Sequence, residues 1–498
     1  MNKIKSVICI ALTFALVIGS TNVSALAADR ETRINRNVIV DGGEGKLIKT
    51  VDFCYEDAMY VSLKGMAAAL NGTQRPYEVM ITSDKIEIFP GNSYTGEYST
   101  WTQEEAEEVA KASRAKNEIN VNGEKKSYYS IIMKDGEDGY DAYMTLVDLA
   151  MIIDADFSFF GETIRVNSSN GFHITPETME ESGYLQGVNA LLIGDSTTGE
   201  IFYEYDGDDI YPIASTTKLM TYYVFMDGVR DGYLSLDDSA TITKKAADLS
   251  ESIDGVILMK EGMNVPIQEL MQGMLLASSN ECALSLAVYA AEKMGIIVDE
   301  DYESVYTSSA DAAENAFVRL MNNKASELGM SSAVFYNPHG LPIYPEHVLP
   351  AKRQNRMTAE DMFKLVGNLL REYPQITDVT SIKESKLSVL GKEIKNTNGL
   401  LYNLDEVKGL KTGTTNKSGA CLITAAGIEK DGVVHDLVVV LFGAESGDER
   451  TRVSEISVRY GKKAIAESNG VISVPEDTGI PSDPDAVVKK LIKLGIKR

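Results

Sequence analysis

Three short segments in the second half of the chain carry hydroxyl, amine and amide side chains that together could cleave an amide bond. Residues 215–218 read Ser-Thr-Thr-Lys, residues 278–280 read Ser-Ser-Asn, and residues 411–413 read Lys-Thr-Gly. A serine forms a covalent acyl intermediate with a carbonyl substrate when a neighbouring base removes its proton. The chain therefore offers a serine nucleophile together with two lysines that can influence it.

The spacing of the first segment assigns the nucleophile and its base. Residues three apart share one face of a helix, so the amine of Lys218 can reach the hydroxyl of Ser215. Lysine is normally protonated at neutral pH, but burial and a second cation such as Lys411 both lower its pKa and make it a usable base. Ser278 can then relay a proton to the leaving amine, while Asn280 orients Lys218 and the substrate amide.

The third segment suggests how the substrate is held. Gly413 has no side chain, which lets a substrate backbone lie against the strand edge. The backbone N–H groups of Ser215 and Thr414 are candidates for an oxyanion hole. Each motif alone is weak, because residues 113–116 repeat the Ser-x-x-Lys pattern and residues 168–170 repeat Ser-Ser-Asn. The prediction rests on all three motifs occurring in order.

The elements that must position these groups form an α+β pattern in residues 171–465. Segments with the 3.6-residue helical period, such as 270–293, lie between two pairs of strand-like runs. These runs are 190–193, 200–203, 420–426 and 436–443. Strands at both ends of the segment predict one sheet that uses both, with helices between them in sequence.

Residues 30–170 contain an internal repeat and are expected to form a separate domain. The similar segments are 40–42 and 121–123, then 60–67 and 143–150, with a strand-like piece closing each copy at 86–88 and 164–166. Each copy predicts a strand, a short helix and a strand. The Ser-Ser-Asn-Gly stretch at 168–171 is a reasonable hinge to the following domain.

Residues 188–462 resemble the low-molecular-mass penicillin-binding proteins, which are serine-type D-alanyl-D-alanine carboxypeptidases. The resemblance rests on the three ordered motifs and on four further segments, 212–221, 337–341, 396–401 and 409–415. It implies a penicillin-binding α+β fold and an acyl-enzyme on Ser215 that releases the terminal D-alanine of peptidoglycan stem pentapeptides. It also implies that β-lactams acylate this serine and that the reaction needs no cofactor and no metal.

The resemblance extends to the remaining site residues. It implies that Ser278 and Asn280 complete the proton-transfer network and that Lys411 and Thr412 face the substrate carboxylate. Arg450 matches the arginine that helps to hold this carboxylate in the family. The alternative for Arg450 is a solvated surface arginine in a charged run.

The chain departs from the family pattern at two places. Ser279 stands where glycine is common, which could narrow the groove or alter substrate preference. After Leu341, a familiar histidine-containing stretch is replaced by other residues, His347, Lys352, Arg353 and Arg356. We interpret His339, in the Asn-Pro-His-Gly-Leu turn, as structural rather than catalytic.

Two other functions compete with the carboxypeptidase. A class A-like β-lactamase shares the three motifs but uses an additional glutamate for deacylation. No Glu-x-x-Leu-Asn occurs between Asn280 and Lys411, so a long-lived acyl-enzyme is expected instead of fast penicillin turnover. The other alternative is a catalytically silent scaffold that binds the cell wall through its repeated domain.

The repeated domain resembles the stalk domain named after the N-terminal domain of copper amine oxidases. No histidine precedes His173 and the acidic residues are scattered, so we expect no copper site. A spacer, either purely structural or in contact with the cell wall, is the simplest interpretation.

The two ends of the chain carry targeting patterns. Lys3 and Lys5, the apolar run 7–19 and Ala-Leu-Ala at 25–27 predict a signal peptide over residues 1–27, because this run is too short to span a bilayer. In the tail, residues 466–498, a basic amphipathic helix follows Pro484. It can bind the outer face of the cytoplasmic membrane or dock on the acidic surface of the enzyme. The signal peptide predicts an exported, extracytoplasmic protein, in the cell wall or peripheral on the outer face of the cytoplasmic membrane.

Composition excludes several other classes of function. The 498 residues carry a net charge of -25, and this acidity disfavours nucleic acid as a partner. Cys54, Cys282 and Cys421 are the cysteines beyond the signal segment, too few for a disulfide framework. No Cys-x-x-Cys or His-Glu-x-x-His motif is present, which disfavours a zinc peptidase.

Overall fold

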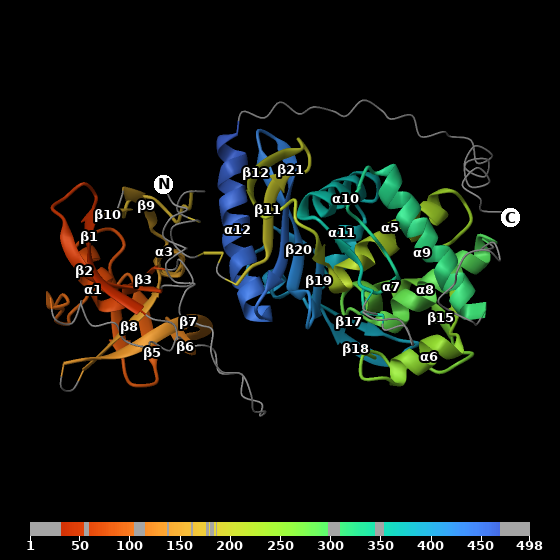
Figure 1. Ribbon diagram of the computed structural model, residues 1–498, viewed down its shortest axis with the longest axis horizontal. Coiled ribbons are helices and arrows are strands. Elements are labelled where there is room, and N and C mark those ends of the chain that lie inside the picture. Colours follow the sequence, from red (N-terminus) through yellow and green to blue (C-terminus); the bar gives the residue numbers. More distant parts are fainter. Residues whose placement is uncertain are drawn as a thin grey trace, which may run out of the picture.

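The computed structural model describes two units that lie side by side (Figure 1). The described residues are 31–53, 59–103, 115–136, 139–160, 163–175, 179, 184–185, 187–296, 309–343 and 353–468. The expected signal peptide and the tail helix after Pro484 lie outside them, as do Cys54, His347 and Lys352. Among the described residues, no helix combines the length and the apolar character needed to cross a membrane.

The N-terminal unit, red to orange in Figure 1, is built on one mixed sheet. Its strand order is β4-β5-β6-β7-β8-β3-β2-β1-β10-β9. The strands are β1 (Glu31–Val40), β2 (Lys46–Phe53), β3 (Met59–Ser62), β4 (Tyr77–Ile81), β5 (Ile86–Pro90), β6 (Ala115–Val121), β7 (Glu124–Asp135), β8 (Gly139–Thr145), β9 (Asp156–Phe160) and β10 (Thr163–Asn167).

The two sequence repeats exchange strands within this sheet. Strand β5 of the first repeat pairs in parallel with β6 of the second, and β1 of the first pairs in parallel with β10 of the second. Strands β3 and β8 pair at the centre, with Tyr60 opposite Thr145. The repeats therefore interlock into one domain and do not form two separate units.

Equivalent helices follow the central strands, as the repeat predicts. Helix α1 (Leu63–Leu70) begins after Ser62, and α3 (Leu146–Ile153) begins after Thr145. The Ser62 hydroxyl accepts a hydrogen bond from the N–H of Gly65, and the Thr145 hydroxyl accepts one from the N–H of Asp148. Each bond satisfies an otherwise unpaired N–H of the first helical turn. The expected hinge begins with a fixed residue, because Ser168 is fully buried and bonds Asp41 through its N–H and its hydroxyl.

The second unit contains an antiparallel sheet with the order β12-β11-β21-β20-β19. The strands are β11 (Ala190–Asp195), β12 (Glu200–Tyr205), β19 (Val407–Thr415), β20 (Gly419–Lys430) and β21 (Val433–Ala444). The prediction that one sheet uses both ends of this segment is confirmed, and so is the α+β class. Strand β19 lies at an edge and begins at Val407, upstream of the Lys-Thr-Gly segment.

Side chains alternate across this sheet and feed two cores. Val438 and Val440 belong to the core shared with the helical part, whereas Leu437 and Val439 belong to the core on the other face. Helix α12 (Gly447–Glu467) packs against β20 and β21, and α10 (Ala359–Glu372) packs against β11 and β21 (Figure 1).

The helical part lies beyond β19. It contains α5 (Lys218–Arg230), α6 (Lys244–Glu251), α7 (Ile267–Leu275), α8 (Asn280–Lys293), α9 (Ser309–Glu327) and α11 (Ile376–Thr380). Short pieces complete the unit: η2 (Ala214–Thr217), η3 (Gly399–Tyr402), β13 (Tyr211–Pro212), β14 (Ser239–Thr241), β15 (Asn264–Pro266), β16 (Arg356–Met357), β17 (Glu384–Leu387) and β18 (Lys392–Lys395). The periodic segment 270–293 is not one helix, because residues 276–279 interrupt it.

Candidate active site

The candidate nucleophile lies on a tight turn at the start of a buried helix. Ser215 belongs to the 3-10 turn η2, and Lys218 begins α5 directly after it. Ala214, which precedes the serine, has a φ of 45°, a left-handed conformation that is costly for a residue with a side chain. Such strain persists only where the surrounding structure imposes it, and it is common at active sites.

Lys218 makes three close polar contacts although it is completely buried. Its Nζ lies 2.9 Å from Ser215 Oγ, 2.9 Å from Asn280 Oδ1 and 2.7 Å from the carbonyl oxygen of His339. Burial lowers the pKa of Lys218 to about 7, and the nearby carboxylate of Glu281 acts in the opposite direction. The amine is thus available in its neutral form near neutral pH.

The three contacts suit a neutral amine that acts as a base. The two N–H groups of the neutral form can donate to Asn280 and to the carbonyl of His339, since both oxygens only accept. The remaining lone pair then points to the hydroxyl of Ser215 and can take its proton. The arrangement therefore matches a serine nucleophile with a lysine general base.

Asn280 is held by a neighbouring loop, which fixes the orientation of its amide. Its Nδ2 donates to the carbonyl of Asp254 at 2.9 Å, so Oδ1 faces Lys218. The same loop is pinned by Glu281, whose Oε1 accepts from the N–H groups of Val256 and Ile257. The carboxylate of Glu281 is completely buried. Glu281 therefore fixes the loop to which the Asn280 amide is hydrogen-bonded.

The serines of the second motif have different surroundings. Ser278 lies two residues before Asn280 and has a φ of 62°, a second left-handed residue in the site. Ser279 points into the protein, where its hydroxyl caps α8 by accepting from the N–H of Cys282 at 3.1 Å, and it is fully buried. The expectation that Ser279 narrows the groove is wrong, because this side chain faces the helix instead.

The third motif is linked to the segment just before the second motif through a residue that the sequence analysis did not single out. Thr412 Oγ1 lies 2.6 Å from Thr397 Oγ1, and the Thr397 N–H donates to the carbonyl of Leu276 at 3.1 Å. Thr397 belongs to the Asn-Thr-Asn-Gly-Leu segment 396–400. Lys411 is buried, and its Nζ donates to the carbonyl of Thr412 at 2.8 Å. Burial, together with the charges of Lys218 and Arg450, lowers the pKa of Lys411.

Two glycines allow the turn of the nucleophile to be approached closely. A Cβ at Gly413 would lie 2.9 Å from the backbone nitrogen of Ser215. A Cβ at Gly340 would lie 2.0 Å from the carbonyl oxygen of Ala214, and Gly340 also has a φ of 93°. The missing side chain of Gly413 therefore makes room for the nucleophile turn, a reason different from the contact with substrate backbone that we expected.

Arg450 joins the site from α12. Its Nη1 lies 3.3 Å from Thr414 Oγ1, at the end of β19. Its Nε is buried without a hydrogen-bond partner in the described part of the chain. Burial lowers the pKa of Arg450, whereas Asp448 acts in the opposite direction. Arg450 is thus partly enclosed beside the Lys-Thr-Gly strand, unlike a freely solvated arginine.

The turn that contains His339 supports Lys218 through its main chain. Burial is the first reason why the pKa of His339 lies well below its ordinary value, and the charge of Lys218 contributes. Its neutral ring accepts from the N–H of Leu341 at 3.2 Å. Of the basic residues that follow, Arg353 lies over the ring of Tyr336, and Arg356 is an exposed residue of β16. Because Nδ1 of the His339 ring already accepts this hydrogen bond from Leu341, we interpret the ring as structural and not as a catalytic base.

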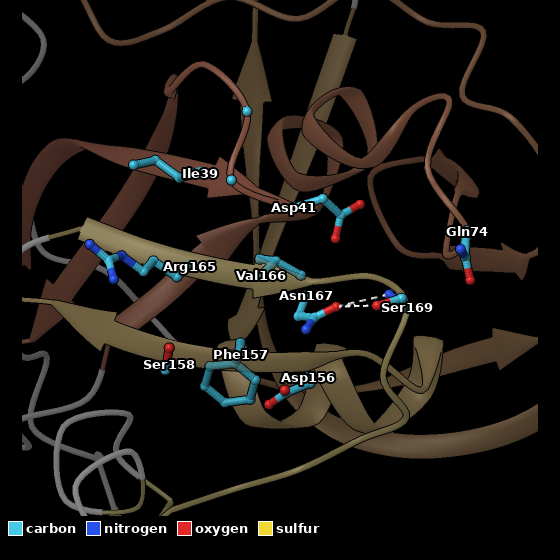
Figure 2. A pocket seen from close by; sticks show the side chains of 12 residues that line it. Ile39, Asp41, Gln74, Asp156, Phe157, Ser158, Arg165, Val166, Asn167 and Ser169 are labelled. Atoms are coloured by element: carbon cyan, nitrogen blue, oxygen red, sulfur yellow. Dashed lines mark hydrogen bonds between the residues drawn. The ribbon is translucent and has the colours of Figure 1, made fainter.

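A cavity of about 860 Å³ lies elsewhere, in the N-terminal unit (Figure 2). It is lined by β1, β9, β10 and the turns beside them. Several of its polar groups already have partners: Asn167 accepts from both the N–H and the hydroxyl of Ser169, and Asp41 accepts from the N–H and the hydroxyl of Ser168. Among the described residues, no group of three or more His, Cys, Asp or Glu side chains is placed to hold a metal ion. The nucleophile geometry is found at Ser215 and not in this cavity.

A family of known proteins matches the region that contains this site. The family model described as D-alanyl-D-alanine carboxypeptidase matches residues 178–297 and 308–446, more than half of the chain. The match contains the three motifs, while Arg450 lies just beyond it.

Curated relatives cover the same part of the chain. D-alanyl-D-alanine carboxypeptidase DacF of Bacillus subtilis is 28% identical over 53% of this chain and 58% of its own length. DacA of Escherichia coli is 28% identical over 48% of this chain and 52% of its own. A D-alanyl-D-alanine endopeptidase of Pseudomonas aeruginosa is 30% identical over 50% of this chain and 70% of its own. The chain thus spans little more than half the length of the first two.

Solved structures of similar chains include penicillin-binding protein D2 of Listeria monocytogenes with ampicillin bound. It is 26% identical, with a TM-score of 0.44 over 55% of this chain and 97% of that one. Another is PBP3 of Streptococcus pneumoniae, 25% identical, with a TM-score of 0.47 over 55% of this chain and 73% of that one.

Proposed function

The chain belongs to the D-alanyl-D-alanine carboxypeptidase family, and we propose that it removes the terminal D-alanine from peptidoglycan stem pentapeptides through an acyl-enzyme on Ser215. The observation that carries the proposal is the contact of the buried Lys218 amine with Ser215 Oγ at 2.9 Å, fixed by Asn280 and the His339 carbonyl. This geometry provides both a nucleophile and its base.

The reaction has two balanced steps. Ser215 Oγ attacks the carbonyl of the penultimate D-alanine and its proton passes to Lys218, so that an ester forms. The peptide C–N bond breaks as the leaving D-alanine nitrogen takes a proton through Lys218 and Ser278. Water then attacks the ester carbonyl and gives a proton to Lys218; the C–Oγ bond breaks, Lys218 returns the proton to Ser215 Oγ, and the shortened peptide leaves as a carboxylic acid.

The substrate carboxylate is proposed to bind between Lys411 and Arg450. Neither Lys411 nor Arg450 makes an ion pair within the part of the chain that the structure describes. Lys411 lies on β19 next to Thr412, and Arg450 contacts Thr414 of the same strand from α12. A carboxylate that accepts from such donors forms the stronger, charge-assisted kind of hydrogen bond. This part of the site therefore favours a substrate with a free carboxyl terminus.

β-Lactams are proposed to acylate Ser215 and to be released slowly. Rapid release in class A β-lactamases uses a further glutamate, and the Glu-x-x-Leu-Asn pattern that would supply it is absent between Asn280 and Lys411. We therefore favour a carboxypeptidase over a β-lactamase.

A fluorescent penicillin and a D-alanine assay on a stem pentapeptide test these functions together. The carboxypeptidase predicts a stable label and release of D-alanine, both lost in Ser215→Ala. A β-lactamase would give a label that disappears quickly, and a silent wall-binding scaffold would give neither signal. Ser215→Ala protein with full D-alanine release would exclude the proposed mechanism. A cross-linked peptide dimer in the same assay distinguishes endopeptidase activity, the activity named for the Pseudomonas relative.

The regions outside the family match suggest where the enzyme acts. We propose that residues 1–27 direct export and are removed, that residues 30–170 form a spacer like the N-terminal domain of copper amine oxidases, and that residues 171–465 form the catalytic domain. The tail, 466–498, is proposed to bind the outer face of the cytoplasmic membrane through its basic amphipathic helix. A protein ending at Ser482 should lose binding to anionic liposomes, and retained binding would exclude this anchor.

A further inference from the structure

Helix α12 lies between the two units, where it contacts both. Figure 1 shows it as the element of the second unit that faces the N-terminal unit. On one side, Gly461 of α12 approaches Leu437 and Ile193 of the sheet. On the other, residues of α12 such as Val453 belong to the same apolar core as Val147 of α3. The N-terminal unit is therefore packed against the helix that carries Arg450.

A network of buried charges crosses this contact. Arg452 of α12 donates from Nη1 to Asp148 Oδ1 of α3 at 2.8 Å. The same guanidinium donates from Nε to Glu449 Oε2 at 3.1 Å, and its Nη2 contacts Glu449 Oε1. All three residues are buried: Arg452 is 8% exposed, Asp148 is 1% exposed and Glu449 is 4% exposed. Both ends of the guanidinium fork are thus occupied, one by each unit.

Each member of the network has further partners that restrict it. Asp148 Oδ2 accepts from the hydroxyl of Thr145 at 2.7 Å, and Arg452 Nη2 donates to the carbonyl of Tyr184 at 3.3 Å. The hydroxyl of Tyr184 donates to the carbonyl of Val453 at 2.7 Å. Because these groups are buried, removing one partner leaves another unsatisfied.

The network is centred on the turn from which Arg450 enters the active site. Ser446 caps α12: its hydroxyl accepts from the N–H of Glu449 at 3.1 Å, and its carbonyl accepts from the N–H of Arg450 at 2.9 Å. Glu449 therefore faces the network while Arg450, the next residue, contacts Thr414. Helix ends fray readily, and an arginine near a helix N-terminus opposes the helix dipole unless acids accompany it.

We infer that Asp148 of the N-terminal unit is a positioning residue for the active site: by holding Arg452, and through it Glu449, it fixes the first turn of α12 and so the placement of Arg450 against the substrate carboxylate. The inference rests on the proposed function, and it gives the repeated domain a part in substrate binding beyond that of a spacer. Asp148 touches no substrate and acts through Arg450.

The test compares acylation of the full chain by benzylpenicillin and by its methyl ester, which lacks the carboxylate. Asp148→Asn removes one charge, keeps the size of the side chain and leaves the Arg452–Glu449 pair intact. The second-order rate constant of acylation by the free acid should fall about fivefold to tenfold. This loss is smaller than that expected for complete removal of a hydrogen bond to a charged group, because Arg450 is displaced and not deleted. The rate constant for the ester should stay within a factor of about two of wild type, because the ester has no carboxylate for Arg450 to hold.

Two further proteins make the test specific. In Arg450→Ala the free acid should lose at least as much, and adding Asp148→Asn should cause little further loss, because the two residues act in one chain. Asp135→Asn is the matched control, since Asp135 pairs with Lys49 and Lys64 inside the N-terminal unit. It should leave the ratio of acid to ester unchanged.

The outcomes separate this inference from the proposed function. Equal losses on acid and ester in Asp148→Asn, or additive losses with Arg450→Ala, would overturn the inference while the enzyme remained a penicillin-binding carboxypeptidase. If the unchanged protein neither took up penicillin nor released D-alanine, the proposed function itself would fail. Should Asp148→Asn not fold, Arg452→Lys carries the same test, because it keeps the charge but loses the fork that joins Asp148 to Glu449.

Discussion

The amine of Lys218 lies 2.9 Å from the hydroxyl of Ser215 and has no exposed surface. Burial favours the neutral amine, and the two acceptors beside it, Asn280 Oδ1 and the His339 carbonyl oxygen, leave the lone pair directed at the nucleophile. The two residues are joined by only one turn of chain, so their distance is set by local backbone geometry. The polar groups that contact the Lys218 amine from elsewhere in the chain come from α8 and the His339 turn.

The first prediction concerns pH. Because the pKa of Lys218 is lowered to about 7, the amine is protonated and inactive as a base at lower pH and becomes neutral above that value. The acylation rate should therefore rise through about pH 7 and level off above it. A profile of acylation by fluorescent penicillin from pH 5 to 9 measures this directly.

The control for this profile is Lys218→Arg, which cannot supply a neutral base in this range. It should acylate about 10²- to 10⁴-fold more slowly, the usual contribution of a general base. If Lys218→Arg kept substantial activity and its acylation rate still fell below about pH 7, a group other than Lys218 would be titrating.

The second prediction concerns Glu281, whose negative charge favours the protonated form of Lys218. Glu281→Gln removes the charge but keeps the oxygen that accepts from Val256 and Ile257. The acid limb of the acylation profile should then move to lower pH, by about one unit for a charge at close range. Asp141→Asn, which neutralises a buried acid of the N-terminal unit, should not move it. An unshifted limb in a folded Glu281→Gln protein would remove Glu281 from the site.

The third prediction separates two roles for Ser279. Because its hydroxyl caps α8, Ser279→Ala should lower the free energy of unfolding by about 1 kcal/mol, and Ser279→Gly by only a few tenths. Neither change should alter the relative rates on different stem peptides by more than about twofold, since the side chain faces away from the groove. Thermal unfolding and a comparison of two peptides test both statements. A changed peptide preference in Ser279→Gly would restore the groove interpretation.

These cases show which features were predictable from the sequence. Ser215 and Lys218 were, because three-residue spacing on a helix is a local rule, and the shared sheet followed from strand-like runs at both ends of the domain. Glu281, Thr397 and Asp148 were not. Their partners are distant in sequence or are backbone groups, and a single buried acid or threonine has no distinctive pattern. The break before Asn280 was missed because the apolar residues on both sides of residues 276–279 fit one helical period.

The last prediction concerns the close approach of β19 to the nucleophile turn. A Cβ at Gly413 would lie 2.9 Å from Ser215 N and 3.0 Å from Thr216 N. Both are backbone atoms that cannot rotate away, so Gly413→Ala must push the strand and the turn apart. A displacement of this kind should lower acylation by roughly 10²-fold, since the reacting groups depend on sub-ångström placement.

Gly367→Ala in α10, where the nearest atom is the side-chain Cβ of Ser196 at 3.3 Å, should keep nearly full activity. Measuring penicillin acylation and melting temperature for both variants distinguishes a local displacement from unfolding. If Gly413→Ala acylates normally while remaining folded, the strand and the nucleophile turn are not in the close contact described above.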